Sequence, residues 1–298
     1  MAVLQRREFL KQASGLCLGA LVDPFLPGEI SVSDNLEQRI IINLPAYELT
    51  LLSLDEKYVF TISIGRNAYG RDPTPFGEGV VSEKRERVIF RYGQDYPQYN
   101  KKRGDVIYWT NTYDESGEPT GYKMPYKDMR SLAIKVKSTA NGYAYWNDRN
   151  VIHSTTDEFT IGTPSSDGCV RVGIKDMLKL YDLVAPDVKN GKLKNPVKLE
   201  ITYNVLELKN DNLVIHADVY KRGIDYAEEF KASVLNAGMD LAGFDYERVK
   251  KEFADANTDF EAAHKEILTK LMKGWPNSYL SPELKQRMHR TYTLSSFC

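Results

Sequence analysis

The chain has few cysteines, few histidines and almost no net charge, and each shortage limits what the protein can be. It contains three cysteines and four histidines in 298 residues, with a formal net charge of −1. Such a charge gives no electrostatic reason to expect nucleic acid as a partner. The apolar run at residues 13–22 is ten residues long, too short to span a bilayer as a helix. A hydrophobic content of 42% still indicates a soluble protein with a substantial core.

The N-terminal residues are typical of an export signal. The basic segment RREFLK at residues 6–11 is followed by the short apolar run, which is the order expected of a secretory signal. The paired arginines resemble the twin-arginine motif, which directs folded proteins across the bacterial inner membrane. We therefore expect residues 1–28 to be a twin-arginine-like signal, with the protein located in the periplasm or cell envelope. The membrane is then a partner only during export. An ordinary amphipathic N-terminal helix is the alternative.

Removal of such a signal would leave two cysteines, Cys169 and Cys298. Two cysteines separated by more than a hundred residues do not make a disulfide framework. A bridge between them is conceivable, but it would consume the thiol of Cys169. A cysteine kept beside a glycine, in a chain with so few cysteines, favours a catalytic role.

The four histidines differ in their surroundings. His264 lies on an apolar helical stripe and is expected in the core, whereas His289 lies in the basic segment KQRMHR and is expected to be solvated. His216 ends a predicted strand. His153 lies in VIHSTT, where an apolar strand gives way to hydroxyl side chains, sixteen residues before Cys169. A histidine brought near a cysteine by the fold can take the thiol proton and activate the sulfur. The spacing alone is weak evidence, because such pairs arise often by chance.

The pattern of apolar residues divides the chain into a β-rich part and a helical part. Residues 39–64 are rich in β-branched and aromatic residues and indicate strands. The segment IKDMLKLYDLV predicts a helix over residues 174–184, and residues 197–220 read as two strands joined by a turn at 210–212. Beyond residue 225 two helical stripes follow. We therefore expect a β-rich domain at about residues 35–222 and a helical C-terminal region at 223–298.

The string IHSTTDEFTIGTPSSDGCVRV resembles the signature of the L,D-transpeptidase catalytic domain. The residues that carry the resemblance are His153-Ser154, Ile161-Gly162, Pro164, Ser166, Gly168-Cys169 and Val170-Arg171-Val172. Three further segments are similar to parts of that family: INLPAYELTLL to its opening strand, IGRNAYGRDPTPFGEG to its glycine- and proline-rich segment, and the strands ending in HADVY to a later hairpin. The resemblance covers roughly residues 38–222.

The resemblance implies a fold, a reaction and its participants. The fold would be mainly β, a β-sandwich of the L,D-transpeptidase type with a short helix after the cysteine, plus a helical C-terminal extension (α+β overall). Cys169 would attack the bond between the third residue of a peptidoglycan stem peptide, diaminopimelate, and the terminal D-alanine. An amine would then resolve the thioester: a second stem gives a 3→3 cross-link, and a lipoprotein lysine gives a wall anchor. Water would instead make the enzyme an L,D-carboxypeptidase. No metal or organic cofactor is implied.

The resemblance also assigns roles within the site. His153 would be the general base and Ser154 would orient its imidazole. Ser166, Asp167, Gly168 and Arg171 would form the oxyanion and substrate loop, since N–H groups around Gly168 and Cys169 can stabilise a tetrahedral intermediate. Arg171 would support that loop or meet a substrate carboxylate.

Asp167 departs from the family pattern, which has histidine at this position. A carboxylate beside the thiol raises the thiol pKa and disfavours its activation. Four interpretations stay open: Asp167 orients His153, recognises a cationic group on an altered stem peptide, marks a weakened or inactive site, or is purely structural. A catalytically weakened, peptidoglycan-binding protein is therefore the alternative to an enzyme.

Overall fold

The computed structural model describes residues 38–53, 56–66, 74–86, 90–91, 102, 106–107, 110–113, 119–123, 129–140, 143–147, 150–184, 188–189, 191–272 and 279–298. The expected export signal at residues 1–28 lies outside the described residues. Across the described ranges, none of the helices combines the length and the apolar character that a membrane crossing requires.

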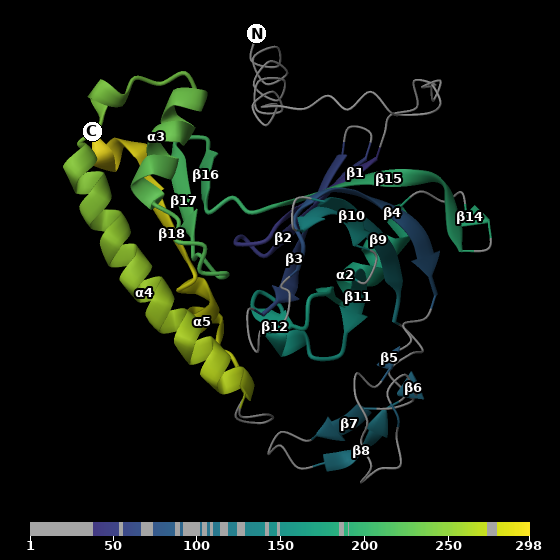
Figure 1. Ribbon diagram of the computed structural model, residues 1–298. Helices are drawn as coiled ribbons and strands as arrows, with labels where there is room; N and C mark the ends of the chain where they lie inside the picture. The colour runs from purple at the N-terminus through teal and green to yellow at the C-terminus, as the bar shows by residue number, and fades with distance from the viewer. Residues whose placement is uncertain are drawn as a thin grey trace.

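One large sheet dominates the structure, and its path returns to the strand on which it began (Figure 1). The order is β1-β2-β3-β13-β11-β9-β4-β15-β14, and β1 also pairs with β15 in parallel, which closes the path. β10 pairs with β9, and β12 with β3. Its strands are β1 (Arg39–Asn43), β2 (Glu48–Ser53), β3 (Glu56–Gly65), β4 (Gly77–Arg85), β9 (Ser131–Ala140), β10 (Tyr143–Asn147), β11 (Val151–Thr155), β12 (Pro164–Ser166), β13 (Val170–Gly173), β14 (Val188–Lys189) and β15 (Lys192–Thr202). The mainly β architecture is confirmed, and the closure refines the expected sandwich.

Alternation of buried and exposed residues fixes the register of this sheet. Every second residue points into the core of the closed sheet, as the 2-residue period of a strand requires. These buried residues include Ile40, Ile42, Leu49, Leu51, Phe60, Ile62, Ile64, Leu132, Ile134, Val136, Val170, Val172, Val197, Leu199 and Ile201. A slip of one residue in any pairing would turn such side chains outward, so burial holds the strands in register.

The predicted helix after Cys169 is confirmed as α2 (Ile174–Leu183). Its buried residues, Met177 and Leu180, lie on the face that meets the sheet, and the helix contacts β9, β11 and β13. The short 3-10 helix η2 (Glu158–Thr160) lies between β11 and β12. Two small ladders, β5 (Phe90–Arg91) with β6 (Val106–Ile107) and β7 (Thr110–Tyr113) with β8 (Pro119–Lys123), stand apart from the large sheet.

A second group of elements lies beside the closed sheet, with α4 along its outer flank (Figure 1). Its members are β16 (Leu206–Lys209), β17 (Asn212–His216), α3 (Tyr226–Asn236), η3 (Leu241–Gly243), α4 (Tyr246–Met272), α5 (Pro282–Gln286), β18 (His289–Thr293) and η4 (Leu294–Phe297). The helical character of the C-terminal part is confirmed, and the two predicted stripes form the single helix α4. Residues 197–220 contain parts of three strands, β15 to β17, where two were expected. The sheet β16-β17-β18 joins segments from both sides of residue 222.

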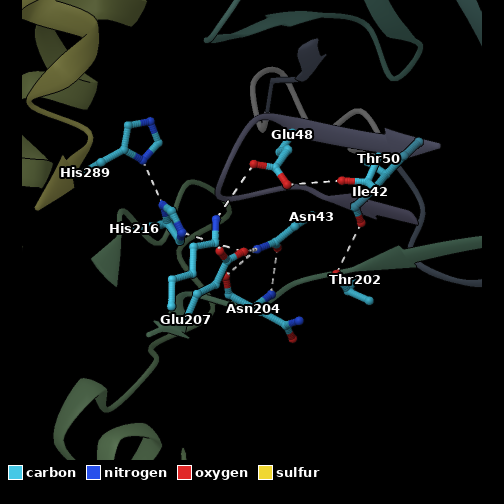
Figure 2. Close-up of polar contacts among 10 residues, drawn as sticks. Ile42, Asn43, Glu48, Thr50, Thr202, Asn204, Glu207, His216 and His289 are labelled. Carbon is cyan, nitrogen blue, oxygen red and sulfur yellow. Dashed lines mark hydrogen bonds and ion pairs between the residues drawn. The ribbon is translucent and has the colours of Figure 1, made fainter. Parts of the chain in front are cut away.

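A polar cluster connects the second group to the β1–β2 hairpin (Figure 2). The Asn43 amide donates to the backbone carbonyl of Asn204 at 3.0 Å and to Glu207 Oε1 at 2.5 Å, and its own oxygen accepts from the Asn204 N–H at 3.0 Å. Lys209 Nζ lies 2.5 Å from Glu207 Oε2 and 3.8 Å from Glu48 Oε2. The largely buried carboxylate of Glu207 therefore binds a side chain from each group, Asn43 from β1 and Lys209 from β16.

Two histidines extend this cluster, and one of them corrects an expectation. His216 and His289 are opposite residues of β17 and β18, and their Nδ1 atoms lie 2.8 Å apart in a hydrogen bond. His289 is only partly exposed, and its ring also meets that of Tyr47 edge-on at 5.8 Å. The expectation of a solvated His289 is therefore wrong, because the basic segment around it forms the third strand of a sheet. His264 is buried on α4 as expected.

Glu207→Gln should remove a pH-dependent part of the stability. Burial alone would raise the pKa of Glu207, but hydrogen bonds and charge from His216 and Lys209 outweigh it and lower the pKa from 4.5 to about 2. The stabilisation is therefore complete above about pH 4.5 and is lost as the pH falls through about 2. We expect the variant to lose up to roughly 3 kcal/mol of unfolding free energy at neutral pH, measured by urea unfolding.

The matched control is Glu200→Gln, which removes the partner of Arg39 in a half-exposed ion pair. Such pairs contribute about 0–1 kcal/mol. The difference between wild type and Glu207→Gln should shrink as the pH falls from about 4.5 toward 2. A difference that stays constant over this range would contradict the ionic role of Glu207.

Candidate active site

The parallel pair β11–β13 brings His153 and Cys169 to one face of the sheet. The register pairs Ile152 with Val170 and His153 with Arg171. Since Val170 and Val172 point into the core, the alternation turns Cys169 and Arg171 to the opposite face, together with His153. The charge of Arg171 acts on the pKa of both His153 and Cys169, in agreement with this placement. Three residues singled out from the sequence therefore lie on one face of the sheet.

The imidazole of His153 is held by the residue that follows it. Its Nδ1 lies 2.6 Å from the backbone carbonyl oxygen of Ser154. A carbonyl only accepts, so Nδ1 carries the hydrogen and the neutral ring has its lone pair on Nε2. Burial lowers the pKa of His153 from 6.5 to about 4, with a further lowering from Arg171, although the bond to Ser154 partly opposes it. His153 is therefore a neutral base at neutral pH.

Ser154 orients His153 through its backbone, and its hydroxyl group fixes the strand. The Ser154 hydroxyl accepts from the N–H of Arg130 at 2.9 Å and donates to the carbonyl of the same residue at 3.3 Å. The Ser154 N–H also donates to that carbonyl at 3.0 Å. The side chain is fully buried. Three bonds to one residue thus set the position of the carbonyl that His153 uses.

Cys169 is a free, partly buried thiol, and Cys298 is free and exposed. Burial raises the pKa of Cys169, and the negative charge of Asp167 adds to the increase. A hydrogen bond with the backbone of Val151 and the charge of Arg171 partly oppose it. The thiol of Cys169 and the imidazole of His153 are therefore both neutral at neutral pH, and activation of the sulfur requires proton transfer during attack.

The turn before Cys169 is closed by Ser166. Its hydroxyl accepts from the Gly168 N–H at 3.0 Å and donates to the Cys169 carbonyl at 2.5 Å. Gly168 has a φ of 126°, a conformation that side chains other than hydrogen rarely allow. Of the two N–H groups expected to stabilise an oxyanion, that of Gly168 is thus engaged with Ser166. The N–H of Cys169 makes no hydrogen bond to an acceptor in the described part of the chain.

Asp167 faces a cation that the sequence did not single out. Its carboxylate lies 3.0 Å from Nη2 of Arg66, which follows β3, with side-chain exposures of 54% and 28% respectively. The Arg66 N–H also donates to the Ser166 carbonyl at 2.9 Å. Arg66 therefore holds the turn through both its backbone and its side chain, and it partly balances the carboxylate beside the thiol.

Sequence reasoning also missed two residues behind the turn. Thr74 is fully buried, and its hydroxyl donates to the Gly168 carbonyl at 2.8 Å. Its own N–H donates to the Tyr220 hydroxyl at 3.2 Å. The proline-containing string PTPFGEG was the available signal, but nothing in it distinguishes Thr74 from a surface threonine. Among the residues that the structure describes, no group of three or more His, Cys, Asp or Glu side chains is placed to hold a metal ion.

Comparisons with known proteins agree on one family. The model of the L,D-transpeptidase catalytic domain matches residues 37–199. A curated protein of Escherichia coli K12, the probable L,D-transpeptidase YcfS, is 24% identical over 228 residues, which is 73% of this chain and 64% of that protein. The chain thus spans less than two thirds of that relative.

Solved structures with similarity include an L,D-transpeptidase from Mycobacterium smegmatis, 14% identical, with a TM-score of 0.35 over 56% of this chain and 59% of that one. Another is an L,D-transpeptidase from Stackebrandtia nassauensis, 14% identical, with a TM-score of 0.30 over 59% of this chain and 62% of that one.

Gly65→Ala should displace the turn that carries Cys169. A Cβ at Gly65 would lie 2.7 Å from the Thr74 nitrogen and 2.8 Å from the Gly168 Cα, and backbone atoms cannot yield without moving the turn. We expect a loss of about 1–3 kcal/mol in unfolding free energy, as for other overpacked sites, together with slower alkylation of Cys169. Thermal unfolding and mass spectrometry of iodoacetamide-treated protein measure the two effects.

Gly243→Ala is the matched control, because a Cβ there meets nothing within 4 Å and Gly243 has no positive φ. Its unfolding free energy should be unchanged or slightly increased. If Gly65→Ala behaved like Gly243→Ala in both measurements, the close approach of β3 to the turn would not matter.

Proposed function

The chain belongs to the L,D-transpeptidase catalytic domain family, and on this premise we propose that it is a peptidoglycan L,D-transpeptidase with Cys169 as its nucleophile. Members of this family act on peptidoglycan in the periplasm or cell envelope. The observation that carries the proposal is the placement of His153 on the face of Cys169 and Arg171, with its Nδ1 bonded to the Ser154 carbonyl at 2.6 Å. This bond leaves Nε2 as the basic atom of the pair.

In the first half-reaction Cys169 attacks the carbonyl of the diaminopimelate residue that precedes D-alanine in a tetrapeptide stem. His153 Nε2 takes the thiol proton as the sulfur–carbon bond forms. The tetrahedral intermediate then collapses, the carbon–nitrogen bond breaks, and the same proton passes from His153 to the departing amine of D-alanine. A thioester on Cys169 and free D-alanine are the products.

In the second half-reaction an amine attacks the thioester. His153 takes a proton from this amine and returns it to the sulfur as the new amide forms, so the thiol of Cys169 is regenerated. The side chain of diaminopimelate on a second stem gives a 3→3 cross-link, and a lipoprotein lysine gives an anchored protein. Water gives net removal of D-alanine. We favour transfer to an amine, as the family membership suggests.

The residues around the turn support distinct roles. The Ser154 carbonyl already orients His153, so a loop-holding role suits Asp167 better, in partnership with Arg66. Arg171 lies on the reacting face and is suited to meet a carboxylate of the stem peptide, such as that of D-alanine. Ser166 and Gly168 form the frame of the turn.

We further propose that residues 1–28 export the folded protein by the twin-arginine route, and that residues 35–222 form the catalytic domain with 223–298 as its helical extension.

The decisive experiment is incubation of the purified protein with a disaccharide-tetrapeptide, followed by mass spectrometry of the products. We expect release of D-alanine and a dimer with a 3→3 linkage. Cys169→Ala should release none, and His153→Ala should lower the rate by about 100- to 10,000-fold, the usual contribution of a general base. A monomeric tripeptide as sole product would establish hydrolysis in place of transfer.

Cys298→Ala is the control for loss of a thiol, because Cys298 is exposed and distant in sequence from the site. It should keep full activity. If the wild-type protein released no D-alanine yet was retained on peptidoglycan, a binding protein on an inactive catalytic fold would be the better description.

The rate of acylation should show its acidic limb near pH 4. His153 acts as a base only when neutral, and its pKa is lowered from 6.5 to about 4 by burial, so the rate is retained above about 4 and falls as the pH drops through that value. Stopped-flow measurement of β-lactam acylation, with circular dichroism at each pH to verify folding, tests this expectation. A limb near the ordinary histidine pKa of about 6.5 would show that His153 is not buried as described.

A further inference from the structure

We propose that Thr74, supported by Tyr220, is a positioning residue that aims the backbone N–H of Cys169 at the oxyanion formed during acylation. This inference rests on the proposed function and deepens it, because it names which N–H stabilises the intermediate and what holds that group. The class of ligand is the tetrahedral oxyanion of an acyl carbonyl attacked by Cys169.

The Cys169 N–H is a backbone donor that the bonds within the turn leave available for the oxyanion. The Gly168 N–H is bonded to the Ser166 hydroxyl, the Cys169 carbonyl accepts from that hydroxyl, and the Ser166 carbonyl accepts from the Arg66 N–H. The Cys169 N–H has no acceptor among the described residues. It belongs to the residue whose sulfur makes the new bond, so it lies near the carbonyl under attack.

The direction of this N–H is set by the carbonyl on the other side of the same peptide bond. The Gly168 carbonyl and the Cys169 N–H belong to one planar unit and point in opposite directions. Thr74 Oγ1 donates to the Gly168 carbonyl at 2.8 Å. The hydroxyl of Thr74 therefore fixes the orientation of the peptide plane that follows Gly168, a residue without a side chain that would otherwise leave this plane flexible.

Thr74 is itself anchored on two sides. Its hydroxyl accepts from the Gly65 N–H at 2.8 Å, and its own N–H donates to the Tyr220 hydroxyl at 3.2 Å. Thr74 and Gly65 are thereby packed against Gly168, as the absence of space for a Cβ at Gly65 shows. A donor fixed in this way needs no reorganisation when charge develops, which is the condition for strong oxyanion stabilisation.

Tyr220 connects Thr74 to the second group of elements. It follows β17, its ring stacks on that of Tyr203 at 5.4 Å, and its N–H donates to the Tyr203 hydroxyl at 2.8 Å. The Tyr203 hydroxyl in turn donates to Asp218 at 2.6 Å. The segment is tied to the C-terminal end of the chain, because the Ala217 N–H donates to the Met288 carbonyl at 2.9 Å.

Two reactions of the Cys169 thiol distinguish a loss of oxyanion stabilisation from a general disturbance of the site. A carbapenem acylates Cys169: the sulfur–carbonyl bond forms through an oxyanion, the lactam carbon–nitrogen bond breaks, and the thiol proton passes to the lactam nitrogen. Iodoacetamide alkylates Cys169: the sulfur bonds to carbon, iodide leaves, the thiol proton is released, and no oxyanion forms. Both rates are measured for Cys169 alone by peptide-resolved mass spectrometry.

Thr74→Val keeps the shape of the side chain and removes its hydroxyl. We expect acylation to slow by about 10- to 100-fold, somewhat less than the loss of an entire oxyanion donor, while alkylation stays within about 3-fold of wild type. Thr74→Ser restores the hydroxyl and should recover most of the acylation rate. Tyr220→Phe removes the hydroxyl that accepts from the Thr74 N–H and should give an intermediate loss, about 3- to 10-fold, again confined to acylation.

The matched control is Thr202→Val, which removes a hydroxyl that donates to the Ile42 carbonyl at 3.2 Å, between β15 and β1 (Figure 2). It should leave both rates unchanged. If Thr74→Val slowed both reactions equally, or neither, the positioning role would be overturned. Should Thr74→Val not fold, Thr74→Ser and Tyr220→Phe decide the question by the same two rates. A wild-type protein that is alkylated but never acylated would instead overturn the proposed function.

Discussion

The candidate site depends on the C-terminal end of β3, whose backbone bonds to the chain on both sides of Cys169. Before the cysteine, β3 pairs in parallel with β12, and the Arg66 N–H donates to Ser166. After it, β3 pairs antiparallel with β13, where Ser63 lies opposite Arg171. The turn between β12 and β13 thus has both ends fixed on one strand. Only glycine at position 65 allows that strand to come so close.

This confinement also explains the charge state of the site. Burial shifts the two reacting groups in opposite directions, raising the pKa of Cys169 and lowering that of His153 to about 4. A resting thiolate–imidazolium pair is therefore disfavoured, and in the proposed mechanism the proton passes from sulfur to His153 as the sulfur attacks. The proposed reaction therefore relies on the alignment of base, sulfur and oxyanion donor. The hydrogen bonds made by Ser154, Ser166 and Thr74 hold the backbone and the imidazole in ways that suit this alignment.

The sequence predicted the parts of this site that lie close together along the chain. The His153 and Cys169 motif and the helix over residues 174–184 follow from local order and from the 3.6-residue period. Arg66, Thr74 and Tyr220 could not be found in this way, because their importance arises from contacts with residues 94 to 146 positions away, such as Thr74 with Tyr220. The same reason applies to His289, which looks solvated in a basic segment until β18 pairs with β17. The pairing of β1 with β15 that closes the sheet is equally invisible to local pattern.

The two groups of elements meet at several places in the described structure, and two of these contacts, one at Glu207 and one at Tyr220, have different consequences. At the first, Asn43 and Glu207 join the β1–β2 hairpin to β16 through a buried carboxylate (Figure 2), which ties the groups together but does not touch the turn. At the second, Tyr220 reaches Thr74 directly behind Gly168. The Asn43–Glu207 contact holds the second group of elements against the closed sheet. The Tyr220–Thr74 contact then connects this group to the peptide plane before Cys169. On this proposal the second group of elements contributes to the chemistry by helping to hold the Cys169 N–H in one direction, through Tyr220 and Thr74.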